Sequence, residues 1–198
     1  MTAILVVCTG NICRSPLAEG FLRSILIRRF GADAPTVASA GTGGWEGSPA
    51  MEGSVQAAME REVDISGHLA RKLAPAMVDG ADLIVCMAGE HRDEILRARP
   101  AAERKVFTLK ELVRVLDRLP AAETAGPEAL GDRVAKAGAE RASGFAGNPL
   151  DDDIADPLGQ PLEAYRAIAW ELDTWSQRLA EGLFGRTPIP SSVSGEGG

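Results

Sequence analysis

The amino-acid sequence predicts an α/β fold, a doubly wound parallel sheet of about four strands with helices on both faces. Short apolar runs alternate with longer segments of helical periodicity, which is the order that βαβ units produce. The first apolar run, Ala3–Val7, contains no polar residue, as expected of a strand buried on both faces. A short glycine-containing loop then leads directly into an amphipathic segment.

Four strands are expected from apolar runs too short for helices. Ala3–Val7 is followed by Thr36–Ala40, which is the weaker pattern of the two. Asp82–Met87 is a strong candidate because Leu, Ile and Val follow one another, and Lys105–Phe107 is a short fourth strand. A glycine-rich loop, Gly41–Gly47, follows the second strand.

Helices are expected where apolar residues recur every three or four positions. Pro16 suits the first turn of the first helix, where its missing N–H has no partner to lose. Thr108 is a suitable N-cap, and Glu111 three residues later completes a capping box. The expected helices are Pro16–Phe30, Ala50–Glu62, Glu90–Arg97, Leu109–Leu119 and Leu162–Leu183.

The chain of 198 residues is long enough for one domain, which we expect to span residues 1–185. Ala121–Gly147 is rich in Ala and Gly and has almost no large apolar residues. We expect it to be an inserted loop or marginal helix rather than part of the core. Arg186–Gly198 is rich in Pro, Ser and Gly, which predicts a disordered tail.

Charge and composition exclude several functions. The net charge of -7 argues against nucleic acid as a partner, because that binding needs a basic surface. No apolar run approaches the ~20 residues of a membrane span, and the N-terminus lacks the pattern of a signal peptide. Three cysteines are too few and oddly counted for a disulfide framework. We therefore expect a reducing, cytoplasmic location and no membrane partner.

The first strand is followed by a candidate phosphate loop, residues 8–15, with the sequence Cys-Thr-Gly-Asn-Ile-Cys-Arg-Ser. A loop between a strand and a helix N-terminus binds anions, because backbone N–H groups and the helix dipole face it. Gly10 and Asn11 are the residue types that most readily adopt positive φ. The loop lacks the Gly-Lys-Ser/Thr ending of a Walker motif.

Cys8 and Arg14 give this loop a specific chemistry. A cysteine near a helix N-terminus and an arginine favours its thiolate form, and a guanidinium matches two phosphoryl oxygens. Ser15 can hydrogen-bond the thiolate. Together these residues predict attack of sulfur on phosphorus and covalent catalysis in two steps. The alternative from the residues alone is that Cys8 and Cys13 are small buried hydrophobes and Arg14 is a solvated helix start.

Residues 7–19, Val-Cys-Thr-Gly-Asn-Ile-Cys-Arg-Ser-Pro-Leu-Ala-Glu, resemble the signature of the low-molecular-weight protein tyrosine phosphatase family. The resemblance extends over nearly the whole chain outside the insert and the tail. It implies that Cys8 is the nucleophile and that Arg14 binds the phosphate. The loop residues Thr9, Gly10, Asn11, Ile12, Cys13 and Ser15 would surround that phosphate. Asn11 would be held in a left-handed conformation by polar contacts.

The family resemblance also indicates the general acid. In this family an Asp-Pro pair before the final helix supplies the proton, and Asp156-Pro157 occupies that place. Without the resemblance, an acidic turn that caps the last helix would be the simpler interpretation. Asp151, Asp152 and Asp153 are expected only to solvate the loop.

Two further polar residues match family positions. The resemblance implies that Ser39, at the end of the second strand, and His68 join Ser15 in the hydrogen bonds that fix Asn11. His91 matches no such position, and its charged helix predicts an ordinary surface or helix-start histidine.

The walls of the substrate cleft are less defined. Trp45 is either an aromatic wall of the cleft or an apolar plug for its own glycine-rich loop. Leu158 replaces the aromatic residue that many tyrosine phosphatases of this family carry after the Asp-Pro pair. Cys13 in this family can pair reversibly with the nucleophile, whereas Cys86 in its apolar strand is expected to be inert.

Three relatives share this scaffold, a phosphotyrosine phosphatase, a protein-arginine phosphatase and an arsenate reductase. Ile12 favours the first, because the arginine phosphatases carry a threonine there and Ile offers apolar contact to a phenyl ring. The reductase requires a downstream pair of redox cysteines, and only Cys86 remains. A catalytically silent phosphopeptide-binding module is a fourth possibility, although none of the catalytic positions is degenerate.

The expected partner is a phosphotyrosine-containing protein, such as a bacterial tyrosine kinase. Phosphate and vanadate are expected to inhibit by competing for the loop. We expect no metal and no cofactor, because the cysteines and histidines lack ligand spacing and a thiolate mechanism needs neither.

Overall fold

The computed structural model describes residues 3–43, 45–122, 126–144 and 151–186. A parallel sheet with the strand order β2-β1-β3-β4 forms its centre. The strands are β1 (Ala3–Cys8), β2 (Thr36–Gly41), β3 (Leu83–Cys86) and β4 (Val106–Thr108). The predicted doubly wound sheet is confirmed, with strands where the apolar runs indicate them.

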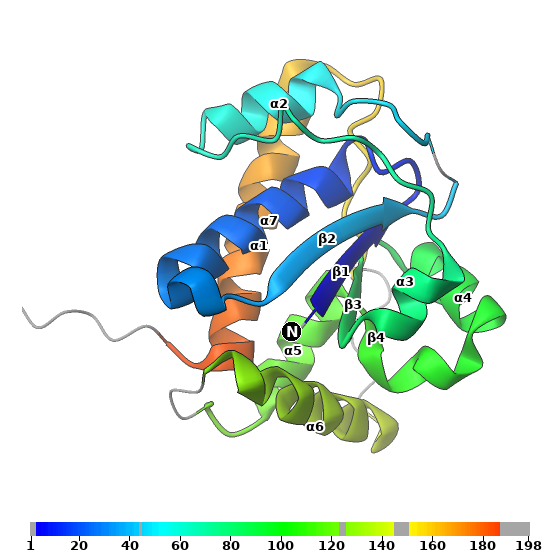
Figure 1. The fold of residues 1–198 in the computed structure, drawn as a ribbon, viewed down its shortest axis with the longest axis vertical. Coiled ribbons are helices and arrows are strands. Elements are labelled where there is room, and N and C mark those ends of the chain that lie inside the picture. Colours follow the sequence, from blue (N-terminus) through cyan, green and yellow to red (C-terminus); the bar gives the residue numbers. More distant parts are fainter. Residues whose placement is uncertain (1–2, 44, 123–125, 145–150, 187–198) are drawn as a thin grey trace, which may run out of the picture.

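Helices cover both faces of the sheet (Figure 1). One side carries α1 (Arg14–Phe30), α2 (Glu52–Met59), α5 (Leu109–Arg118) and α7 (Leu162–Phe184). The other side carries α3 (Pro75–Gly80) and α4 (Gly89–Ala98). The sheet has a hydrophobic core on each side. Along β1, Ile4 and Val6 point into the core on the side of α1 and α7, whereas Leu5 and Val7 point into the core on the side of α3 and α4. This alternation explains why the strand is apolar at every position.

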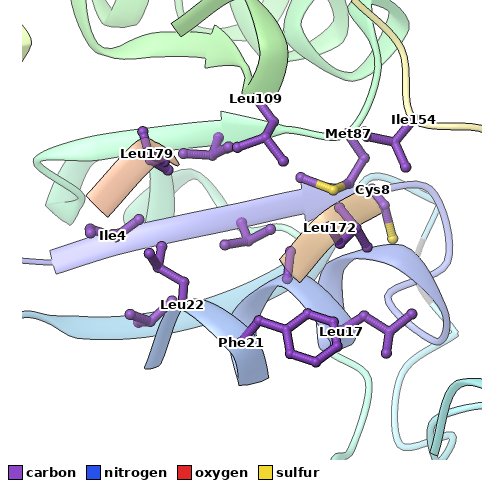
Figure 2. Close-up of a cluster of buried hydrophobic side chains, with 14 of the residues drawn as sticks. Ile4, Cys8, Leu17, Phe21, Leu22, Met87, Leu109, Ile154, Leu172 and Leu179 are labelled. Atoms are coloured by element: carbon purple, nitrogen blue, oxygen red, sulfur yellow. The ribbon is translucent and has the colours of Figure 1, made fainter. Parts of the chain in front are cut away.

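The larger core lies between β1, α1 and α7 (Figure 2). Buried side chains at its centre include Ile4, Leu17, Phe21, Leu22, Leu172 and Leu179. At the carboxyl end of the sheet the same cluster continues to Cys8, Met87 and Ile154. The segments that follow β1 and β3 are therefore held in place by packing against this core.

The helix boundaries differ modestly from the predicted ones. The capping box of α5 is present, since Thr108 Oγ1 accepts from the backbone N–H of Glu111 and the Glu111 carboxylate accepts from that of Thr108. The helix predicted at Ala50–Glu62 is shorter, and α3, which begins at Pro75, is additional. Short 3-10 helices occur at η1 (Gly31–Asp33), η2 (Pro100–Lys105) and η3 (Pro127–Ala129). None of the described helices has the length and apolarity needed to cross a membrane.

The prediction that Ala121–Gly147 stays outside the core is wrong for residues 130–142, although a helix was one of the two forms expected. Residues 130–142 form α6 (Leu130–Ala142), and Leu130, Val134 and Ala137 are buried at helical spacing. Three buried apolar side chains are enough to pack α6 onto the core, because its small residues let the helix lie close to the neighbouring backbone. A Cβ on Gly138 would lie 2.9 Å from the carbonyl oxygen of Arg104. Positions 123–125 and 145–147 of the insert, and 187–198 of the predicted tail, lie outside the described residues.

Candidate active site

The loop between β1 and α1 has the geometry of an anion site. The N-cap residue of α1, Cys13, makes no capping hydrogen bond with its side chain, which leaves the first backbone N–H groups of the helix for a ligand. Gly41, at the end of β2, lies directly beneath the loop. A Cβ at that position would be 2.5 Å from the carbonyl oxygen of Thr9 and 3.0 Å from the nitrogen of Asn11. Glycine is therefore required there for the close approach of the two backbones.

Cys8 lies at the base of this loop and is 2% exposed. Its Sγ is 2.9 Å from Ser15 Oγ, and the backbone N–H of Asn11 donates to it at 3.3 Å. The predicted contact of Ser15 with the sulfur is therefore present. Donors directed at a sulfur stabilise its anionic form, which is the form that attacks phosphorus.

Asn11 has φ of 57°, the left-handed conformation that the resemblance implies. Its side-chain Nδ2 donates to Ser15 Oγ at 2.9 Å and to Ser39 Oγ at 2.8 Å. His68 Nε2 donates to the backbone oxygen of Asn11 at 2.8 Å. The contacts expected of Ser15, Ser39 and His68 are all present, and Asn11 is fully buried among them.

Two residues that the sequence analysis missed complete this support. The backbone N–H of Arg71 donates to Asn11 Oδ1 at 2.8 Å, and its guanidinium donates to the Ser39 carbonyl at 2.9 Å. Glu19 is buried, accepts from Ser39 Oγ and is paired with Arg23. Glu19 belongs to the signature itself, but only the fold shows that it faces Ser39.

Arg14 extends from the first turn of α1 toward the loop that carries Asp156. Its NH2 group donates to Asp156 Oδ2 at 2.5 Å and to Thr9 Oγ1 at 3.3 Å, and its NH1 group donates to the carbonyl oxygen of Ile154 at 3.2 Å. The Nε atom of Arg14 is buried and has no hydrogen-bond partner among the residues that the structure describes. A buried donor without a partner, next to a helix N-terminus, is the feature that an anionic ligand would satisfy.

Asp156 is exposed enough to reach a ligand, with 43% of its side chain accessible. The interpretation of the three preceding aspartates as merely solvating is wrong. Asp152 is 4% exposed and paired with Arg114 of α5, and Asp153 accepts from the backbone N–H of Gly89 at 2.7 Å. The sequence of three consecutive aspartates is typical of a solvated turn. In the structure, however, their carboxylates contact residues of α4 and α5. These contacts fix the loop before Asp156.

His91 lies at the start of α4, one of the two placements predicted for it, but it is not a surface residue. It is 1% exposed, and its Nε2 is 2.9 Å from Thr9 Oγ1 in the phosphate loop. Burial and the charge of Arg14 lower the pKa of His91 to about 4, so the imidazole is neutral at ordinary pH. His91 follows the carboxyl end of β3, where ligands of doubly wound folds bind. That position in the sequence could have indicated that His91 lies near the site.

The two predicted cleft residues are both half-exposed. Trp45 is 52% exposed and its Cδ1 is 3.7 Å from the place of a Cβ on Gly10, so the ring stands beside the phosphate loop. Leu158 is 41% exposed. Ile12, in contrast, is only 3% exposed, which leaves it little surface for the predicted contact with a substrate ring.

All three cysteines are free and buried. Burial, with the nearby charges of Asp156 and Cys8, raises the pKa of Cys13 to about 11. Burial likewise raises the pKa of Cys86 far above its usual value, in keeping with the inert core residue that the sequence predicts. In the part of the chain that is described, no group of three or more His, Cys, Asp and Glu side chains could hold a metal ion.

The fold and this site define a phosphatase of the cysteine type, and comparison with known proteins agrees. Residues 3–126 match the family model for low molecular weight phosphotyrosine protein phosphatases. The chain is 33% identical over 180 residues to a protein-arginine-phosphatase of Geobacillus stearothermophilus, covering 91% of this chain and 95% of that protein. It is 41% identical over 109 residues to the probable low molecular weight protein-tyrosine-phosphatase EpsP of Ralstonia solanacearum, covering 55% and 71% of the two chains.

The solved structures include a low molecular weight protein tyrosine phosphatase from T. tengcongensis. It is 32% identical with a TM-score of 0.69, and the match covers 92% of this chain and all of that one. The chain therefore belongs to the low molecular weight phosphotyrosine protein phosphatase family, whose members are hydrolases.

Proposed function

We propose that this protein is a protein tyrosine phosphatase that hydrolyses phosphotyrosine in proteins through a cysteinyl-phosphate intermediate. One observation supports this above the others. The sulfur of Cys8 lies under an uncapped helix N-terminus, within reach of Ser15, while Arg14 joins this loop to Asp156 through a 2.5 Å bond. The proposed nucleophile, phosphate-binding group and proton donor therefore lie at the same end of the sheet.

In the first step the Cys8 thiolate attacks phosphorus, a sulfur–phosphorus bond forms and the phosphorus–oxygen bond to the tyrosine breaks. Asp156, in its protonated form, gives its proton to the departing phenolate oxygen. The Nε of Arg14, which has no partner within the described part of the chain, and the α1 backbone N–H groups bind the phosphoryl oxygens. The phosphate competes with Asp156 for Arg14 NH2, which frees the carboxyl group to face the leaving group.

In the second step water attacks phosphorus, and the sulfur–phosphorus bond breaks. The Asp156 carboxylate takes a proton from this water and so returns to the protonated state. Ser15 hydrogen-bonds the sulfur as it leaves as a thiolate, and inorganic phosphate is released. The buried support of Asn11 keeps the loop backbone in place through both steps.

The proposed substrate is a phosphotyrosine-containing protein such as a bacterial tyrosine kinase, and the proposed inhibitors are phosphate and vanadate. Trp45 supplies exposed apolar surface beside the loop for a phenyl ring, and Leu158, two positions after Asp156, is a second half-exposed apolar residue. A cytoplasmic location is part of this proposal, supported by three cysteines that are all free thiols.

The decisive test is hydrolysis of a phosphotyrosine peptide by the purified chain, with Cys8→Ser as the blank. We expect turnover by the wild type, inhibition by vanadate, and a loss of at least about a thousandfold in Cys8→Ser, since a hydroxyl is a far weaker nucleophile. The variant should still bind phosphate. Turnover retained in Cys8→Ser would exclude the cysteinyl-phosphate mechanism, and phosphate binding without turnover in the wild type would indicate a binding module.

Protein-arginine phosphatase activity is the second candidate. The specific observation in its favour is the match over 91% of this chain to the Geobacillus protein of that name, whereas EpsP matches 55% of it. Leu158 in place of an aromatic residue, and the burial of Ile12, remove two features that would favour a phenyl ring. An arsenate reductase is disfavoured, because the remaining thiol, Cys86, is completely buried.

A phosphoarginine peptide assayed at the same concentration as the phosphotyrosine peptide separates these two functions. Faster hydrolysis of phosphotyrosine supports the primary proposal, since Trp45 then supplies the aromatic contact. Faster hydrolysis of phosphoarginine replaces it with the second candidate. Both activities must vanish in Cys8→Ser to be attributed to this site.

A further inference from the structure

We infer that His91 is a positioning residue of this active site, acting through Thr9 to hold Arg14 and, through Arg14, Asp156. The inference rests on the proposed function, because it assigns His91 a role in the same reaction. It concerns α4, an element that contributes no group to the proposed chemistry.

The geometric basis is a continuous chain of polar contacts. His91 Nε2 lies 2.9 Å from Thr9 Oγ1, and Thr9 Oγ1 accepts from Arg14 NH2 at 3.3 Å. The same Arg14 NH2 donates to Asp156 Oδ2 at 2.5 Å. The chain therefore connects a buried residue of α4 to the guanidinium and the carboxyl group that the reaction uses.

The position of the proton on His91 follows from its surroundings. Glu90 Oε1 lies 3.4 Å from the same Nε2, and an anionic oxygen near a ring nitrogen favours a proton on that nitrogen. With the proton on Nε2, the imidazole donates to Thr9 Oγ1. The oxygen of Thr9 then accepts from two sides, from His91 and from Arg14, which fixes it between them.

The imidazole stays neutral in this arrangement. Burial and the charge of Arg14 disfavour its charged form more strongly than Asp153, Glu94 and Asp156 favour it. A neutral donor can lie near the Arg14 guanidinium without repelling it. Nδ1, the other ring nitrogen, is buried with no hydrogen-bond partner among the described residues, so the position of the ring depends on the contact with Thr9 and on packing.

A second set of contacts connects α4 to residues 151–157, the loop that carries Asp156, which we call the acid loop. Asp153 Oδ1 accepts from the backbone N–H of Gly89, and the backbone N–H of Ile154 donates to the carbonyl oxygen of Met87 at 2.7 Å. The first turn of α4 is therefore attached to the residues just before Asp156, while His91 reaches the phosphate loop. Displacement of His91 would loosen Thr9 and Arg14 together.

The test uses a pair of substitutions that separate volume from hydrogen bonding. His91→Leu fills most of the space but has no donor, whereas His91→Gln places an amide Nε2 near the position of the imidazole Nε2. Arg97→Gln is the control, since Arg97 is an exposed residue of the same helix. Each protein is assayed with p-nitrophenyl phosphate for kcat and KM, and its thermal unfolding is recorded.

For His91→Leu we expect kcat to fall about tenfold with less than about a twofold change in KM, because the contacts that His91 orients matter most in the transition state. His91→Gln should recover kcat to within about threefold of the wild type. A merely structural histidine would lower the unfolding temperature and leave kcat of the folded protein unchanged. That result in His91→Leu would overturn the inference while wild-type turnover leaves the proposed function standing.

A double-mutant cycle tests the route through Thr9. Thr9→Val removes the hydroxyl without changing the size of the side chain. If His91 acts through that hydroxyl, His91→Leu should lower kcat by less than about twofold in the Thr9→Val background. Independent tenfold losses that multiply in the double variant would overturn the proposed route. Absence of turnover in the wild type would overturn the proposed function and this inference with it.

Discussion

At the scale of single residues, Asn11 determines the shape of the phosphate loop. It is a non-glycine residue with φ of 57°, a conformation that costs an ordinary L-residue about 1 kcal/mol or more. Three hydrogen bonds of its side chain, to Ser15, Ser39 and the backbone of Arg71, offset that cost. The buried hydrogen bonds therefore stabilise the left-handed backbone conformation that shapes the loop.

Two substitutions of Asn11 separate these contributions. Asn11→Ala and Asn11→Gly both lose the three bonds, which we expect to cost about 3 kcal/mol of unfolding free energy because buried partners are left unpaired. Glycine tolerates positive φ, so Asn11→Gly should be more stable than Asn11→Ala by about 1 kcal/mol. Urea denaturation measures both, and calorimetric titration with phosphate should show weakened binding in each. A Gly variant as stable as the wild type would contradict a stabilising role of the network.

At the scale of elements, α5 acts as an anchor for the acid loop. Arg114 pairs with Asp151 and Asp152, and Lys110 donates to the carbonyl oxygen of Asp153 at 3.0 Å. Arg114 also lies 5.9 Å from the ring centroid of Trp175 in α7. Since Asp152 is almost completely buried, its ion pair with Arg114 fixes the loop more firmly than a surface pair would.

Arg114→Met tests this anchor, because methionine keeps much of the aliphatic length and removes the guanidinium. We expect a loss of about 2 to 3 kcal/mol in unfolding free energy and a severalfold decrease in kcat, as Asp152 loses a partner and Asp156 is less well held. The matched control is Arg178→Met, whose pair with Asp117 is exposed on both sides. It should cost at most about 1 kcal/mol and leave kcat unchanged. Equal kcat values in the two variants would contradict the proposal that α5 helps to position Asp156.

The elements themselves were largely predictable, whereas these connections between them were not. Ala3–Val7 and Asp82–Met87 are apolar enough to predict buried strands, and residues 8–15 predict the loop after the first of them. Periodicity does not show that Asp152 meets Arg114, because the two lie 38 positions apart and each is individually typical of a surface. For the same reason a helix with few large apolar residues, α6, was not expected in the core.

At the scale of the whole molecule, the site is where separate segments converge on one end of the sheet. Cys8, Ser39 and His91 come from or follow three different strands, and Asp156 comes from the loop before α7. The resemblance to the family indicated Cys8, Ser39 and Asp156 from the sequence alone. The burial of His91 was not predicted, because the residues around it in α4 are mostly charged.

The pH dependence of folding should report this buried histidine. Its pKa falls from 6.5 to about 4 on folding, chiefly through burial, so between these values the unfolded chain binds a proton that the folded chain does not. The stability that follows from a neutral His91 is thus fully present above pH 6.5 and is lost as the pH falls through 4, by at most about 3 kcal/mol. Carboxylates contribute in the same range, so the measurement is the difference between wild type and His91→Gln in urea denaturation at pH 4.5, 5.5 and 7. Wild-type stability should decline more steeply toward acid, because glutamine has no proton to gain, and parallel curves would mean that folding leaves the affinity of His91 for protons unchanged.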